Sequence, residues 1–207
     1  MLTENYLDRS SILNHFEAIL GFQEKIAEYV DKRLSLKNEI LDESWEEKRK
    51  EAFKFVRTLI DKYAFSIDLP RDNLGIMAQA IVTYLLNIQH AFLQVLVKID
   101  MLHHKAFNEI YMDSMTNISA KVHEMVTNLK LMINHRAQNS QDAENALELI
   151  IKLERQIDED NIVICRQISV ATNGDSDFIC YMMRKIVSDL EHISDFVKEC
   201  AEIVAEI

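Results

Sequence analysis

The stretch IVSDLEHISDFVKECAEIV, residues 186–204, decides the fold class of this chain. Its apolar side chains recur at intervals of three, four and seven residues, at Ile186, Leu190, Ile193, Val197 and Val204. That spacing places them on one face of an α-helix. Glycine occurs three times and proline once in 207 residues, so little interrupts helices elsewhere. We therefore predict an all-α protein.

Six long helices with short connections are expected along the chain. They are predicted at about residues 8–35, 41–64, 71–100, 106–136, 140–170 and 176–207. Pro70 suits the entry to the third helix, and the turn Thr172-Asn173-Gly174-Asp175 precedes the sixth. Long helices joined by short loops form up-and-down bundles.

The two halves of the chain resemble each other. Residues 81–95 (IVTYLLNIQHAFLQV) align with residues 186–200 (IVSDLEHISDFVKEC) at four identical apolar positions. Such a match predicts an internal repeat, although the helical period alone also imposes similar apolar spacing. We expect two tandem three-helix bundles, residues 1–104 and 105–207, in one continuous domain.

Composition excludes several classes of protein. A net charge of −11 argues against binding nucleic acid through a basic patch. The N-terminus lacks the pattern of a signal peptide, and no apolar run is long enough to span a membrane. The thiols Cys165, Cys180 and Cys200 have no paired spacing, so we expect them reduced and buried. A cytoplasmic protein is predicted, with a peripheral membrane partner left open.

Two pairs of acidic residues carry the strongest functional signal. Glu154 and Asp158 in LERQIDED, and Glu191 and Asp195 in LEHISD, are each four residues apart and therefore share one helix face. If the two helices pack antiparallel, four carboxylates converge. Their mutual repulsion would be costly without a cation, which predicts a metal site.

The alternative is that these acids are simply solvated, as most acids on helix surfaces are. Glu154 speaks against it, because it lies only about 40° from the centre of the apolar arc of its helix. Glu191 and Asp195 lie on a flank of theirs, which favours a site at the bundle surface. Asp189 and His192 point away from the apolar arc, and we expect both to be solvated.

The chemistry of the ligands restricts the metal. Carboxylates suit hard cations, or iron when bridging acids share several ions. A second site is predicted at Glu47, Glu51 and His90. Its partner helix has Leu86 and His90 where the sixth helix has Glu191 and Asp195, so metal should bind the C-terminal unit first.

LERQIDED, followed after about thirty residues by VSDLEHISDFVKECAEIV, resembles the signature of the PhoU family. FSIDLPRDNLGIMAQAI and LNHFEAILGFQEKIAEYVDKRLSL resemble stretches of the PhoU-like accessory proteins of Pit-type phosphate transporters. This resemblance implies two three-helix bundles, metal clusters of iron or zinc, and a role in phosphate transport or its regulation. Glu154, Asp158, Glu191 and Asp195 match one ligand set, and Glu47 and Glu51 match part of the other. The acids that the family carries on its third helix are replaced by Val82, Thr83 and Leu86.

The leading hypothesis is a non-enzymatic, cytoplasmic regulator that docks on a phosphate transporter or its signalling partner. Long amphipathic helices also leave room for a homodimer. One alternative is a carboxylate-bridged di-iron enzyme, although such sites need Glu-x-x-His motifs, which the chain lacks. The other is a metal-free helical interaction protein.

Overall fold

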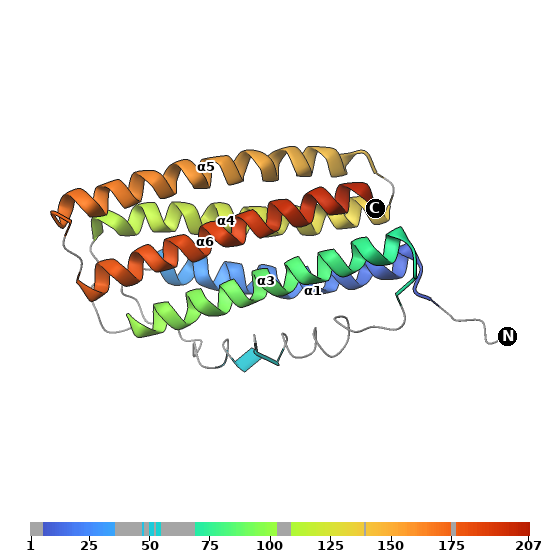
Figure 1. Ribbon diagram of the computed structural model, residues 1–207, viewed down its shortest axis with the longest axis horizontal. Coiled ribbons are helices and arrows are strands. Elements are labelled where there is room, and N and C mark those ends of the chain that lie inside the picture. Colours follow the sequence, from blue (N-terminus) through green and yellow to red (C-terminus); the bar gives the residue numbers. More distant parts are fainter. Residues whose placement is uncertain are drawn as a thin grey trace.

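A computed structural model gives the structure of residues 6–35, 69–102, 109–138, 140–174 and 177–207, together with Glu47, Lys50, Glu51, Phe53 and Lys54. Five long helices account for most of these residues, and no strand occurs among them. The helices are α1 (Arg9–Ser35), α3 (Asn73–Met101), α4 (Glu109–Ala137), α5 (Asp142–Ala171) and α6 (Phe178–Glu206). They lie side by side along one axis (Figure 1).

The contacts between helices define their directions. α1 packs mainly on α4 and α3 mainly on α6, so elements from the two halves of the chain lie against each other. Lys130 pairs with Glu24, and the Thr116 hydroxyl donates to the Leu34 carbonyl, so α1 and α4 are antiparallel. α5 lies on α4 and α6, and its connection to α6 is short enough to make the pair an antiparallel hairpin.

One continuous core joins all five helices. Each helix supplies an apolar stripe with the spacing of the helical period, and the side chains of these stripes are almost completely buried. The largest include Phe16 and Leu20 of α1 and Ile81, Leu85 and Phe92 of α3. Burial of these stripes, rather than helix propensity, is what fixes helices of this length in place.

Local contacts explain where two helices begin. At the start of α3, the Asp72 carboxylate accepts a hydrogen bond from the backbone of Gly75. The Pro70 carbonyl lies so close to Gly75 that a Cβ atom would be only 1.7 Å from it, so only glycine fits there. At the start of α6, Asp177 accepts from the backbone of Cys180 and caps the helix.

The α5–α6 turn uses the residues that the sequence predicted. Asn173 and Gly174 both have positive φ angles, of 50° and 81°. Asparagine and glycine tolerate this conformation better than other residues, so Asn-Gly terminates α5 and reverses the chain.

The prediction of an all-α protein is confirmed. Five of the six predicted helices occur, with ends within three residues of those expected. The predicted helix at 41–64 lies largely outside the described residues. Of the three thiols expected to be buried, only Cys200 is; Cys180 is half-buried and Cys165 is exposed, because it lies on the outer face of α5.

One segment, Asn73–Ile99 of α3, is long and apolar enough to cross a membrane by length and composition. Half of its most apolar window is buried inside the bundle, where it packs against α6 and α1. A core helix of a bundle can pass the same test of length and composition. No second candidate segment occurs in the described part of the chain.

Candidate metal centre

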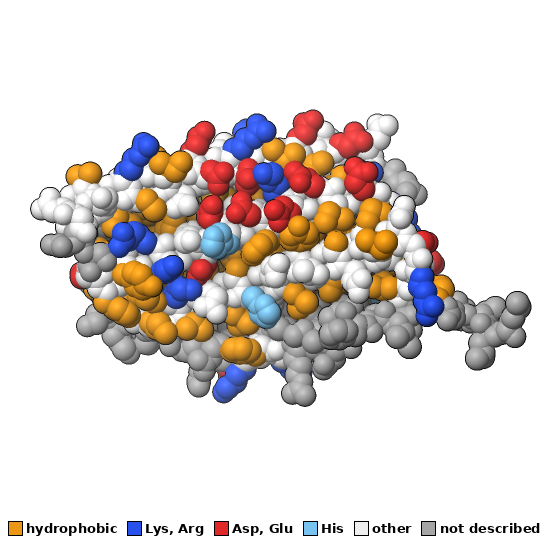
Figure 2. Space-filling model, in the orientation of Figure 1, with side chains coloured by type: hydrophobic (Ala, Val, Ile, Leu, Met, Phe, Trp, Pro, Cys, Tyr) orange, Lys and Arg blue, Asp and Glu red, His pale blue; other side chains and the backbone are white. Residues whose placement is uncertain are grey.

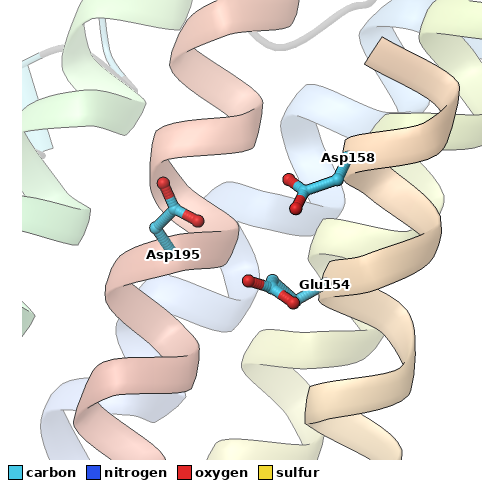
Figure 3. Close-up of side chains that lie close together, drawn as sticks. All are labelled: Glu154, Asp158 and Asp195. Atoms are coloured by element: carbon cyan, nitrogen blue, oxygen red, sulfur yellow. The ribbon is translucent and has the colours of Figure 1, made fainter. Parts of the chain in front are cut away.

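The antiparallel packing of α5 and α6 brings acids from both helices together. Glu154 and Asp158 project from successive turns of α5 towards Asp195 of α6 (Figure 3). One ligand oxygen from each lies within 4.8 Å of the others. Among the residues that the structure describes, this is the only group of three or more potential metal-ligating side chains so close together. We call Glu154, Asp158, Glu191 and Asp195 the carboxylate cluster.

Burial differs across the cluster. Glu154 is 6% exposed, because it lies within the apolar stripe that α5 turns towards the core. Asp158, Glu191 and Asp195 are partly exposed at the rim between the helices. The cluster is therefore a site at the bundle surface with one buried acid at its base.

Desolvation and mutual repulsion both disfavour the ionised acids. Burial raises the pKa of Asp158, and the neighbouring Glu154 raises it further. Burial and then the charge of Asp158 raise the pKa of Asp195. Each shift means that the folded protein resists the negative charge at that position, which is the condition that a bound cation would relieve.

Glu191 belongs to the same electrostatic group without reaching the other three oxygens. Its pKa is raised by burial first and by the charge of Asp195 second, with smaller contributions from Asp158 and Glu154. His192 lies beside it, with the imidazole Nε2 3.6 Å from a Glu191 carboxylate oxygen. Glu191 thus adds charge at the edge of the site.

A lysine that the sequence argument overlooked contacts the cluster. The Lys198 ammonium donates to Glu154 Oε1 at 2.7 Å. This hydrogen bond is the main cause of the raised pKa of Lys198. The signal was present in the sequence, since Lys198 is three residues after Asp195 and therefore on the same face of α6.

The distances fit a cation. Two oxygens bound to one ion are separated by at most twice the metal–oxygen distance, which is about 4–5 Å for magnesium or calcium. One oxygen from each of the three acids lies within 4.8 Å of the others, which is compatible with the longer of these distances, that for calcium. The donor set is all oxygen within the described residues, which suits hard cations, manganese or iron better than zinc.

The residues of the second predicted site are placed differently. Glu47 and Glu51 are helical and exposed, and His90 is exposed on α3. They form no ligand group with one another within the described residues. Leu86, at the position matching Glu191, is half-buried and lines a shallow surface hollow with Val82.

Two residues of α6, Asp189 and His192, were expected to be solvated. The prediction is wrong for Asp189 and confirmed for His192. Asp189 is not solvated, because α3 packs along that flank of α6 and brings the Lys98 ammonium to 2.5 Å from the Asp189 carboxylate. His192 is solvated as expected, with 57% of its side chain exposed.

Comparison of the chain with protein-family models, with curated proteins and with solved structures found no match. The resemblance to PhoU-like proteins therefore rests on the order of the short motifs in the sequence.

Proposed function

We propose that this protein is a non-enzymatic regulator or accessory protein of phosphate uptake, with a metal site at the carboxylate cluster. Two observations support the proposal. The order of motifs along the chain resembles that of PhoU-like proteins. Acids from α5 and α6 converge within ligand distance at the positions matching that family's motif.

The convergence of Glu154, Asp158 and Asp195 is the observation that carries the metal site. An ion bound there would replace repulsion between α5 and α6 with shared ligation. It would join the two helices of the C-terminal hairpin and make their packing depend on metal. A regulator could use such a site either as a permanent brace or as a switch.

The tandem arrangement of two three-helix bundles belongs to the same proposal. The sequence alignment pairs α3 with α6. These two helices pack against each other, as do α1 and α4. Contacts between like helices are what a two-fold related pair of units would make.

Metal analysis tests the site directly. The full chain is purified without tag or added metal, and its iron, manganese and zinc contents are measured beside those of Glu154→Ala/Asp195→Ala. The matched control is Glu159→Ala/Glu199→Ala, which removes exposed acids from the same two helices. About one equivalent or more in the wild type and the control, lost in the cluster variant, supports the site. Equal contents in all three proteins would refute it.

The role in phosphate uptake needs its own experiment. Uptake of labelled phosphate is compared in cells with and without the gene, and the transporter complex is captured with the full-length protein. We expect altered uptake and capture of a phosphate transporter or its sensor. Unchanged uptake together with no such partner would exclude this role, whatever metal is bound.

A metal-free interaction protein is the second candidate, and the Lys198–Glu154 pair favours it. An ammonium at 2.7 Å already offsets part of the cluster's negative charge without any ion. In that case the Glu154→Ala/Asp195→Ala variant would change no metal content. Oxygen consumption coupled to iron oxidation would instead indicate a di-iron enzyme.

A further inference from the structure

The end of the α5–α6 hairpin exposes several large apolar side chains. Val170 is 78% exposed and Phe178 57%, and both adjoin the turn between the helices. Ile162 and Val163 on α5 and Tyr181 on α6 are each about half exposed. We call these five residues the tip patch. Exposed apolar side chains that gather at one end of a molecule are candidates for a binding role.

Basic side chains share the helix faces of the tip patch. On α5, Arg166 lies four residues after Ile162 and four before Val170, so the three form one outward stripe. On α6, Phe178, Tyr181 and Lys185 have the spacing of a second stripe. Both Arg166 and Lys185 are exposed.

Three acids near the tip patch are bonded within the protein. Asp160 of α5 accepts from Lys121 and Asn117 of α4. Asp189 of α6 is paired with Lys98, and Asp177 caps α6. Asp175 lies outside the described residues. The charges of Asp160 and Asp189 are thus offset by lysines of α4 and α3, and these two acids do not pair with Arg166 or Lys185.

The unpaired negative charge lies farther along the hairpin. Acidic side chains gather over the middle of α5 and α6, whereas apolar and basic ones gather at the end that carries the α5–α6 turn (Figure 2). At 1.5 Å per residue, Asp158 is about 12 Å from Arg166, the base of the tip patch on α5. Charges at such a distance are largely screened, because the Debye length is about 8 Å at physiological salt.

We propose that the tip patch binds an anionic lipid surface. Phe178, Tyr181 and Val170 would enter the headgroup region, where aromatic rings are favoured, while Arg166 and Lys185 contact lipid phosphates. The mixture of exposed aromatic, aliphatic and basic side chains on outward helix faces is that of an interfacial membrane anchor. A second copy of the chain is a poorer occupant, because a two-fold contact would bring the bases of two tips together.

Vesicle binding tests this assignment on the full chain. Flotation is measured with phosphatidylcholine vesicles and with vesicles containing phosphatidylglycerol, at low and high salt. We expect binding to the anionic vesicles only, weakened by salt. Phe178→Ser/Tyr181→Ser and Arg166→Gln/Lys185→Gln should each lower the partition coefficient by about tenfold.

Matched controls separate the tip from the rest of the surface. Ile76→Ser/Leu131→Ser removes two apolar side chains of similar exposure from α3 and α4. Lys152→Gln/Arg155→Gln removes one lysine and one arginine from the exposed face of α5 near the acids. Both controls should bind as the wild type does. Losses equal to those of the tip variants would overturn the assignment, since binding would then follow overall charge or hydrophobicity.

Other outcomes would also overturn it. Equal binding to neutral vesicles, or no binding to either kind, would exclude an anionic lipid partner. Sedimentation velocity on the same variants tests whether the tip patch is instead a dimer interface. A wild-type dimer that dissociates in Phe178→Ser/Tyr181→Ser would show that it is. Lipid binding is independent of the carboxylate cluster, so it should persist in Glu154→Ala/Asp195→Ala. Its failure would therefore leave the proposed metal site untouched.

Discussion

Lys198 of α6 donates a hydrogen bond to Glu154 of α5 at 2.7 Å, within a group of acidic side chains. The Glu154 side chain is only 8% exposed and that of Lys198 31%. A buried carboxylate needs a counter-charge. In the described part of the protein, Lys198 supplies one to Glu154, the most deeply buried acid of the cluster. The Lys198 ammonium therefore already contacts one of the carboxylate oxygens that would bind a cation.

Removal of this ammonium should destabilise the metal-free protein. In Lys198→Ala, Glu154 remains buried with the charge of Asp158 nearby, so we expect a loss of about 1–3 kcal/mol in the free energy of unfolding. Urea denaturation with a chelator present measures it. Lys152→Ala, an exposed lysine of α5, serves as control and should change little. An equally small change in Lys198→Ala would mean that water already screens Glu154.

Neutralising an acid of the cluster should have opposite effects with and without metal. With chelator, Asp195→Asn relieves repulsion from Asp158 and Glu154, so its melting temperature at neutral pH should rise above that of the wild type. With excess manganese or iron, the wild type should gain more than the variant, because the variant has lost a ligand. Differential scanning calorimetry of both proteins and of Glu159→Gln checks this. A variant stabilised equally in both conditions would show that no ion binds at Asp195.

The helices were largely predictable because their apolar periodicity and their breaks are local features. The stripe from Ile186 to Val204 and the turn at Asn173-Gly174 fixed α6 within a few residues of its observed start. Which helices pack against each other was harder to predict from the sequence, since an apolar stripe does not specify its partner. That α3 covers the flank of α6 at Asp189 follows from tertiary packing, which the sequence pattern of α6 alone does not contain.

The convergence of acids from α5 and α6 was predicted, but the surroundings of these acids were not. Glu154 was detectable as an acid within an apolar arc, and the structure places it at the buried base of the cluster. Lys198 was not predicted, although it lies three residues after Asp195 on the same face of α6 and contacts Glu154. The tip patch could not be predicted from the sequence either, since the exposure of Val170 and Phe178 depends on where neighbouring helices end.

Asp31 predicts a pH dependence at the α1–α4 interface. Burial raises the pKa of Asp31, and attraction to His123 and the nearby Ser119 hydroxyl oppose the rise only partly. Because the folded protein favours the protonated acid, the stabilisation is complete at a pH below the ordinary pKa of aspartate. It is lost as the pH rises through the raised value.

Asp31→Asn should therefore stabilise the protein at neutral pH and make no difference near pH 3. The asparagine keeps the shape of the protonated acid without its ionisation. Thermal unfolding of both proteins over this pH range provides the measurement, with chelator present to exclude effects of metal. Destabilisation by Asp31→Asn at neutral pH would show instead that the attraction between Asp31 and His123 outweighs burial.

The Lys98–Asp189 pair should contribute more than an exposed pair of similar geometry. Its side chains are 15% and 18% exposed and it joins α3 to α6, whereas those of Lys32 and Glu28 on α1 are 60% and 47% exposed. Solvent screens the exposed pair, for which a coupling energy of about 0.3–0.5 kcal/mol is usual. Low exposure strengthens the first pair, and each single change leaves a desolvated charge behind.

Double-mutant cycles with Lys98→Met and Asp189→Asn, and with Lys32→Met and Glu28→Gln, compare the two pairs by urea denaturation. We expect a coupling of about 1–3 kcal/mol for Lys98–Asp189. The double variant should therefore lose less stability than the sum of the losses in the two single variants. Equal couplings in the two cycles would mean that water reaches the α3–α6 interface as freely as it reaches the surface of α1. The flank of α6 would then owe its position to apolar packing alone, with Asp189 free to serve a partner instead.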